Sequence, residues 1–221
     1  MKTIHMFGDS FVEGYGLKPY EKNLGMLLQE LWDFDNVENH SLAGGSNYRT
    51  VRKIFETEFS SKDIAIIGWT EANRFEFPVI DIANDSEKPS DQPEVCDHYT
   101  VQRFLPNQNS NVEKIKHFTD TLYSNFVDPN YSLDYFRILF TAAEKNLNDK
   151  NVNWFHFFAW DWWYEDLKTH WDLQELVDNG RYIKNIREHL TDDDILPCQH
   201  WSQSGNIKVA DKIDKFVSSL T

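Results

Sequence analysis

The sequence predicts an α/β protein in which helices cover both faces of a parallel β-sheet, giving three layers. Short apolar runs rich in β-branched and aromatic residues alternate with longer segments whose apolar residues recur at helical spacing. Two of the runs, residues 62–69 and 153–160, are apolar without alternation, as in strands covered on both sides. Alternation of strands and helices favours a parallel sheet between two helical layers. The 221 residues, 40% of them apolar, suffice for a single domain over residues 1–221.

The elements are expected in the order β-α-β-α-β-insertion-α-β-α-α. Strands are predicted at residues 2–7, 37–41, 62–69 and 153–160. Apolar residues three or four positions apart predict helices at residues 20–32, 47–59, 132–148, 171–190 (in pieces) and 207–220. In the second of these helices, the residues at helical spacing are Tyr48, Val51, Phe55 and Phe59.

Residues 78–129 interrupt this alternation. They are polar and irregular, and the stretch is too long for an ordinary connection between two elements. We therefore expect a long insertion after the third strand, which serves as a lid, as a partner surface or simply as an insertion.

The chain is acidic, with 22 Lys plus Arg against 36 Asp plus Glu and a net charge of −14. Nucleic acids and anionic membranes require a basic surface, so we expect neither as a partner. The two cysteines, Cys96 and Cys198, form no Cys-x-x-Cys pair, and we expect no metal and no cofactor. Without an apolar stretch of signal-peptide or membrane-spanning length, a cytoplasmic protein is expected, with association with a virion as the alternative. The oligomeric state is left open.

Polar and glycine-rich stretches follow the predicted strands, at the edge where parallel sheets bind ligands. The first strand ends in Gly8-Asp9-Ser10. A Ser at this place can supply an attacking oxygen, and its N–H lies where unpaired amides favour negative charge. A Ser that merely caps a helix is the alternative.

The second strand is followed by the paired glycines Gly44 and Gly45, which let backbone amides approach the same point as that of Ser10. The alternative is a glycine turn capped by Ser46 or Asn47.

The third strand is followed by Thr70 and Asn73, which offer side-chain donors, and by Arg74, which can bind an anionic or hydroxyl-rich substrate. A surface salt bridge from Arg74 to Glu71 or Glu76 is the alternative.

Ahead of the last predicted helix, His200 lies in a loop. From this position an imidazole can reach Ser10 across the edge of the sheet and take its proton. A merely exposed histidine is the alternative, but four such loops coincide at the edge where a site is expected.

These four stretches, in this order, resemble the blocks of the SGNH hydrolases, also called GDSL-type esterases and lipases. The resemblance covers residues 2–75 and 150–220 and implies a flavodoxin-like α/β/α sandwich (the SGNH fold). It implies that Ser10 is the nucleophile, that His200 is the base, and that the N–H groups of Ser10 and Gly44 form an oxyanion hole with the side chain of Thr70 or Asn73. The run from Gly44 to Asn47, with residues 67–70 and Arg74, is similar to SGNH-like proteins of bacteriophages. The matching positions are Gly8, Asp9, Ser10, Gly14, Asn39, Gly44, Ser46, Gly68, His200, Ser202, Gly205 and Ala210.

Two positions depart from the family pattern. Thr70 stands where the family has Asn, and Pro197 stands where the family has the Asp that precedes its His by three residues. Asp194 is the nearest substitute for the triad acid, Asp161 is another, and a backbone carbonyl could also orient the imidazole. The departures are compatible with a slow enzyme or an inactive one.

The resemblance implies acyl transfer to water through an acyl-serine intermediate. Residues 160–171 begin where a buried strand ends and are rich in Trp; exposed aromatic faces suit sugar rings, and core packing is the alternative. We therefore expect a short acyl group, most simply acetate, on a carbohydrate or other small-molecule ester. A non-catalytic carbohydrate- or protein-binding module and an acyltransferase are the alternatives. The residues expected to contact the substrate are Asp9, Trp69, Arg74 and Trp160.

Overall fold

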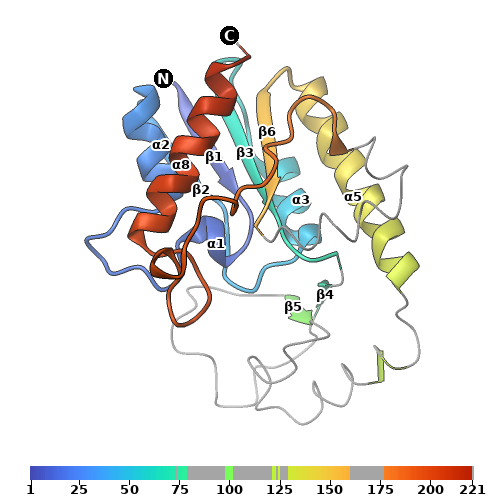
Figure 1. Cartoon of the computed structure of the whole chain (residues 1–221). Helices are drawn as coiled ribbons and strands as arrows, with labels where there is room; N and C mark the ends of the chain where they lie inside the picture. Colours follow the sequence, from blue (N-terminus) through green and yellow to red (C-terminus); the bar gives the residue numbers. More distant parts are fainter. Residues whose placement is uncertain are drawn as a thin grey trace.

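A four-stranded parallel sheet forms the centre of the molecule (Figure 1). The computed structural model describes residues 1–72, 74–78, 98–101, 121–122, 124, 129–159 and 177–220, and the structural statements that follow concern these residues. The strand order is β2-β1-β3-β6, with every neighbouring pair parallel. All four predicted strands are therefore confirmed, with slightly shorter bounds: β1 (Thr3–Phe7), β2 (Asn36–Asn39), β3 (Ile64–Trp69) and β6 (Asn153–Phe158).

Helices cover both faces of this sheet, as predicted. Because side chains alternate along a strand, neighbouring residues of β3 such as Ile66 and Ile67 belong to different core clusters, one on each face. Figure 1 shows α2 (Leu24–Trp32) and α8 (Gln203–Ser218) on one side of the sheet and α3 (Asn47–Glu56) and α5 (Pro129–Asp149) on the other, and the three-layer α/β/α architecture is confirmed.

The segment predicted to be helical in pieces, residues 171–190, is described from residue 177, which is helical, but the prediction is wrong for residues 178–190. Residues 178–190 form turns and extended backbone, and Tyr182 pairs in parallel with His156 of β6. The N–H of His156 donates to the carbonyl of Arg181 at 3.1 Å, and the N–H of Ile183 donates to the carbonyl of His156 at 2.8 Å. The segment therefore pairs with the free edge of β6. The N–H and carbonyl groups at this edge are open to an extended chain, whereas a helix would use its backbone groups internally.

The buried face of α3 differs from the predicted one. Val51 and Ile54 are buried, whereas Tyr48 and Phe55 are exposed. The face is rotated because Asn47, at the start of the helix, is drawn inward to bind backbone groups of the neighbouring loop. A polar tertiary contact has thus overridden the apolar spacing.

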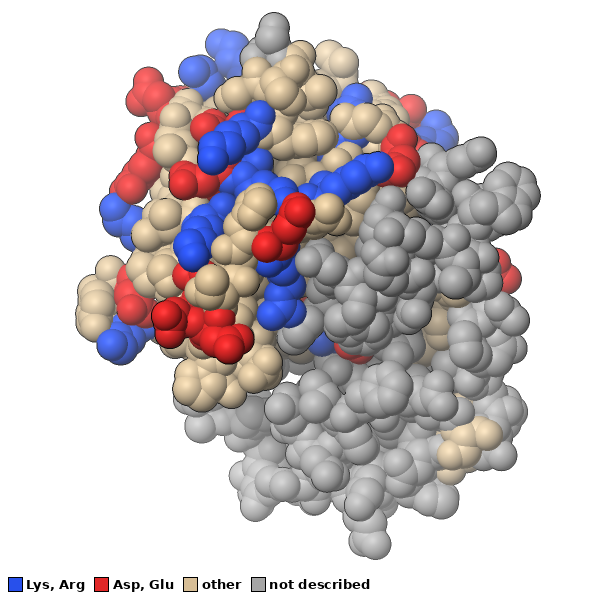
Figure 2. Space-filling model, in the orientation of Figure 1, with Lys and Arg blue, Asp and Glu red and all other residues tan. Residues whose placement is uncertain are grey.

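Part of the insertion predicted at residues 78–129 is described. β4 (Phe75–Pro78) and β5 (His98–Val101) pair as an antiparallel ladder, apart from the main sheet. Among the described residues, no helix has the length and apolar character needed to cross a membrane. On the face shown in Figure 2, which carries α2 and α8, basic and acidic side chains are interspersed.

Candidate active site

Ser10 lies directly beyond the carboxyl end of β1, as the first residue of the short helix α1 (Ser10–Glu13). The helix is capped by Asp9, whose carboxylate accepts the N–H of Phe11 at 3.1 Å, so the Ser10 hydroxyl is not used for capping. Gly8 is required by close packing, because a Cβ there would lie 2.6 Å from Cγ2 of Val12 and 2.8 Å from the carbonyl oxygen of Gly68. The structure therefore favours the nucleophile interpretation of Ser10 over the capping interpretation.

The hydroxyl of Ser10 meets the imidazole of His200. Oγ of Ser10 and Nε2 of His200 are 2.7 Å apart, although the residues are separated by 190 positions in the chain. For Nε2 to accept the Ser10 proton, the neutral ring must carry its own proton on Nδ1. This is the hydrogen bond between nucleophile and base that serine catalysis requires.

His200 directly follows a tight turn from Leu196 to Gln199. The N–H of Gln199 donates to the carbonyl of Leu196 at 2.8 Å, and the N–H of Leu196 donates to the carbonyl of His200 at 2.7 Å. The imidazole also packs against Phe11 and Tyr15, with ring centroids 4.8 and 5.0 Å away. Backbone hydrogen bonds and aromatic contacts together therefore position the base.

The environment of His200 keeps its imidazole neutral. Burial lowers the pKa of His200 below its ordinary value of 6.5, and the nearby charge of Arg74 also lowers it. The charge of Asp9 and the backbone of Cys198 oppose this shift without reversing it. A neutral imidazole at neutral pH is ready to act as a general base.

The loop that carries Gly44 is held against α1. The N–H of Leu42 donates to the carbonyl of Gly8 at 3.3 Å, and the N–H of Ala43 donates to the Glu13 carboxylate at 2.7 Å. Gly44 has a φ of 74°, a left-handed conformation that favours glycine. The second loop is thereby placed next to the residues that carry the nucleophile.

Asn47 joins this loop to the one after β3. Its amide group donates to the carbonyls of Thr70 (2.9 Å) and Glu71 (3.3 Å), and its oxygen accepts the N–H of Thr70 at 3.0 Å. The sequence analysis considered Asn47 only as a cap; its burial, with 2% of the residue exposed, identifies it as a positioning residue. A polar residue at the start of a helix gives little signal of such a role, because helix starts are commonly polar.

The side chain of Thr70 is free to donate a hydrogen bond. Its hydroxyl is buried and has no hydrogen-bond partner among the described residues. The fallback donor, Asn73, lies outside the described residues.

Asp9 and Arg74, both predicted to contact the substrate, form a buried ion pair with each other. Nη1 of Arg74 donates to Oδ2 of Asp9 at 3.0 Å, and the side chains are 7% and 0% exposed. The alternative of a surface salt bridge to Glu71 or Glu76 is wrong, since the partner is Asp9 and the pair is buried, whereas contact of Asp9 and Arg74 with a substrate stays a prediction. The ion pair fixes the nucleophile's strand end to the loop after β3, which is a structural and electrostatic role.

Comparison with known proteins finds a likeness in three dimensions. No protein-family model matches the chain, and no curated protein matches its sequence. A lipolytic protein of the G-D-S-L family from Veillonella parvula DSM 2008 superposes over 97% of both chains, with a TM-score of 0.47 and 11% sequence identity. The crystal structure of TesA superposes over 100% of this chain and 100% of its own, with a TM-score of 0.56 and 10% sequence identity. The fold is that of the SGNH hydrolases. The similarity to bacteriophage members stays a prediction.

Within this SGNH fold, Asp194 does not orient the base. It lies in the short 3₁₀ turn η1 (Asp192–Asp194), and its Oδ2 accepts the N–H of Thr191 (2.8 Å), the hydroxyl of Thr191 (2.9 Å) and Nζ of Lys208 (2.6 Å). Although burial opposes it, these contacts lower the pKa of the Asp194 carboxyl. The assignment of Asp194 as triad acid is therefore corrected: its carboxylate stabilises the turn and α8.

Nδ1 of His200 has no hydrogen-bond partner among the residues that the structure describes. Burial lowers the pKa of this ring, and the charge of Asp9 and the backbone of Cys198 act in the opposite direction. Orientation of the imidazole by a backbone carbonyl, or by Asp161, which lies outside the described residues, stays a prediction.

Trp69 is a core residue. It is 1% exposed and packs edge-on against Phe136, with ring centroids 5.5 Å apart, so it offers no surface to a substrate. Trp160 lies outside the described residues. The exposed aromatic ring beside the base is that of Tyr15, which is 53% exposed. The sequence analysis missed it because a Tyr in a polar loop has no distinctive pattern.

Proposed function

We propose that the protein is a serine esterase that removes a short acyl group, most simply acetate, from a carbohydrate. The single observation that carries the proposal is the 2.7 Å contact between Oγ of Ser10 and Nε2 of His200. The SGNH fold supports it, because the contact lies at the carboxyl edge of the sheet, where α/β proteins of this kind bind ligands.

The first half of the reaction forms an acyl enzyme. Nε2 of His200 takes the Ser10 proton while Oγ attacks the ester carbonyl, and the carbonyl oxygen becomes an oxyanion. The N–H groups of Ser10 and Gly44 and the hydroxyl of Thr70 are the donors available to stabilise it. Loss of one such donor typically costs about 3–4 kcal/mol in the transition state. His200 then gives its proton to the leaving alcohol.

The second half releases the acid. Water loses a proton to His200 and attacks the acyl-serine carbonyl, and the collapse of the second tetrahedral intermediate returns the proton to Ser10. Among the described residues no carboxylate binds Nδ1, and with these residues alone the imidazolium formed in each half is stabilised less than in a triad. The proposal therefore includes a modest turnover rate.

The test is hydrolysis of p-nitrophenyl acetate by wild type, Ser10→Ala and Ser61→Ala. Ser61 is exposed and serves as the matched control. Ser10→Ala is expected to lower kcat/KM at least about 10³-fold, as loss of a serine nucleophile does elsewhere, and Ser61→Ala to leave it unchanged. Equal rates for wild type and Ser10→Ala would remove the enzyme proposal and leave a non-catalytic binding module.

The carbohydrate part of the proposal is supported by the exposed ring of Tyr15 next to His200. An acetylated sugar could lay its apolar C–H face on this ring, as ligands commonly do on aromatic side chains. Tyr15→Ala should raise KM for an acetylated oligosaccharide more than for p-nitrophenyl acetate. Tyr20→Ala, which removes a ring that is 77% exposed, is the control, and equal effects of the two changes would contradict a sugar platform at Tyr15.

An acyltransferase is the second candidate, in which a sugar hydroxyl replaces water in the second half. Product analysis with an acceptor sugar present distinguishes the two, since transfer yields an acylated acceptor and hydrolysis yields free acid.

A further inference from the structure

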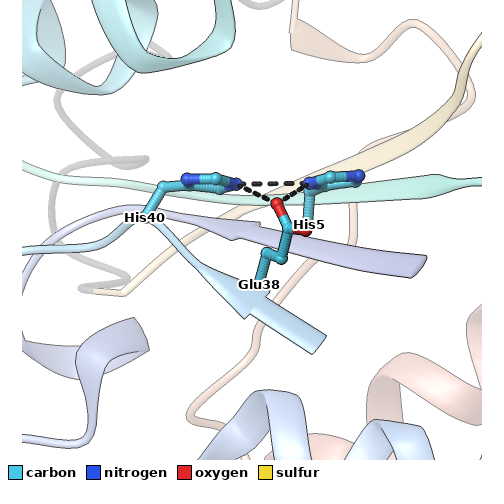
Figure 3. A group of neighbouring side chains, drawn as sticks. All are labelled: His5, Glu38 and His40. Atoms are coloured by element: carbon cyan, nitrogen blue, oxygen red, sulfur yellow. Dashed lines mark hydrogen bonds and ion pairs between the residues drawn. The ribbon is translucent and has the colours of Figure 1, made fainter. Parts of the chain in front are cut away.

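A second group of titratable side chains surrounds His5 of β1. It lies on the face of the sheet opposite to that of Met6. His5 of β1 and Glu38 of β2 are direct partners in the parallel ladder, and His40 follows β2 two residues later. Residues two apart in extended backbone point to the same face, so all three side chains converge. Figure 3 shows the two imidazoles facing each other nitrogen to nitrogen, with the Glu38 carboxylate beside both.

The three ligand atoms form a compact triangle. Nδ1 of His5 and Nε2 of His40 are 3.2 Å apart, and Oε2 of Glu38 lies 3.5 Å from the first and 3.7 Å from the second. Ligands bound tetrahedrally to Zn²⁺ at 2.0–2.1 Å are about 3.3–3.4 Å from one another. The triangle is thus close to one face of a zinc tetrahedron, and a small rotation of both rings towards Glu38 would direct their lone pairs at a common centre.

The surroundings select the ligand atom of His5. Its other nitrogen, Nε2, faces Oδ2 of Asp63 at 3.5 Å, a polar contact without the alignment of a hydrogen bond. Asp63 is itself fixed by the N–H groups of Thr3 (2.9 Å) and Ser60 (2.7 Å). A carboxylate behind a metal-binding histidine favours the proton on the far nitrogen and leaves the near one free to bind.

The rings are packed in a way that keeps them in place. Phe7 stacks on His40 with centroids 4.7 Å apart, and Phe59 contacts His5 edge-on at 4.9 Å. The site nevertheless opens to solvent, because the side chains of His40 and Glu38 are 22% and 47% exposed. They line a surface hollow together with Lys53, Glu56, Thr57 and Glu58. A metal ion therefore has an entry path from solvent, and Lys53, the cation that lines the hollow, is paired with Glu56 at 2.7 Å.

We propose that His5, Glu38 and His40 bind one divalent transition-metal ion, for which Zn²⁺ is the best match. The ion takes the place of the proton shared between the two imidazoles, and a water molecule from the hollow supplies the fourth ligand. Two imidazoles and one carboxylate suit Zn²⁺, whereas Mg²⁺ prefers oxygen ligands alone. Because His40 leads into the loop of Gly44, the ion fastens β1 to the segment that carries the oxyanion donor. The proposal of a metal site does not depend on whether the protein is an esterase.

The test is titration of the full chain, treated with chelator and dialysed, with Zn²⁺ in competition with a chromophoric chelator. One ion per chain is expected, and Co²⁺ in its place should give the strong visible absorption of a tetrahedral site. Glu38→Gln and His40→Ala should each weaken binding at least tenfold, since even residues behind the ligands typically contribute that much. His189→Ala, which removes an exposed histidine elsewhere, is the matched control.

Glu38 is half exposed, so Glu38→Gln keeps the proposal testable if His40→Ala fails to fold. A thermal shift on adding Zn²⁺ that is present in wild type and His189→Ala, but absent in Glu38→Gln, supports the site. Three results overturn it: no saturable Zn²⁺ binding, binding that Glu38→Gln and His40→Ala leave unchanged, or equal competition by Mg²⁺.

Discussion

The nucleophile and the base of the proposed site are held in two different ways. On the nucleophile side, polar contacts join the segments that follow β1, β2 and β3: the buried contacts of Asp9 with Arg74 and of Asn47 with Thr70, and the partly buried contact of Glu13 with Ala43. On the base side, His200 rests on a turn and two aromatic rings, and its Nδ1 has no hydrogen-bond partner among the described residues. The segments that carry Ser10 and Thr70 are thus joined by hydrogen bonds and an ion pair, and we expect the orientation of the imidazole to be the weaker part of the proposed site.

The largest expected effect comes from breaking the ion pair on the nucleophile side. Arg74→Met leaves the Asp9 carboxylate buried without its cation, which should lower the free energy of unfolding by about 3–5 kcal/mol. Urea unfolding measures it. Lys145→Met, which breaks the exposed pair with Asp149, is the control and should cost less than about 1 kcal/mol. Equal effects of the two substitutions would show that the Asp9–Arg74 pair is not a buried anchor.

The next effect concerns the connection between the second and third loops. Asn47→Ala leaves the N–H and carbonyl of Thr70 without their partner, and each unsatisfied buried group costs about 1–3 kcal/mol. Both stability and kcat should fall, because Thr70 loses its support. Asn47→Asp keeps the acceptor for the Thr70 N–H but turns a buried carboxylate oxygen towards the carbonyls of Thr70 and Glu71, so its stability and kcat should fall as well. A normal kcat in Asn47→Ala, in protein that remains folded, would exclude the positioning role.

Acidification tests the base side. Since the pKa of His200 is lowered below 6.5 by burial, kcat/KM should stay level to below pH 6.5 and then fall tenfold per pH unit. An acid limb centred above pH 6.5 would contradict the neutral, partly buried imidazole.

The free energy of unfolding should also depend on pH below 6.5, because of His156. Burial lowers the pKa of this residue to about 3. The unfolded chain binds more protons at this residue than the folded one below pH 6.5, so stability is lost as the pH falls. The loss is at most about 1.4 kcal/mol per pH unit. His156→Gln should flatten the profile of urea unfolding against pH, and His189→Gln, an exposed control, should not.

The smallest expected effect comes from a substitution that places a carboxylate near His200. Pro197→Asp places one where the SGNH pattern has it, and it should raise the pKa of His200 and raise kcat several-fold. Pro197→Ala controls for the loss of the proline ring, which suits the second position of the turn from Leu196 to Gln199. If Pro197→Asp leaves both the pH profile and kcat unchanged, the base side already has a full substitute for the missing acid.

The sequence predicted the layers and the strand ends well, and the partners of charged residues poorly. The run from Ile64 to Trp69 predicted a buried strand, because it is continuously apolar and rich in β-branched residues. Arg74 could be predicted to bind a carboxylate, but its partner, Asp9, is 65 positions away and two other acidic residues are nearer in the chain. Asp194 was chosen for its closeness to His200 in sequence, yet the turn directs its carboxylate towards Lys208.

The sequence by itself therefore determined the α/β/α architecture and the position of Ser10 at a strand end, because apolar periodicity and glycine placement are local properties. The tertiary structure alone decided that Asp9 binds Arg74, that Asn47 supports Thr70, and that His5, Glu38 and His40 converge. The physical reason is that hydrogen bonds and ion pairs act over a few ångströms, so which polar groups meet depends on the path of the whole chain. Many pairings are chemically equivalent in sequence, and only the packed loops select one.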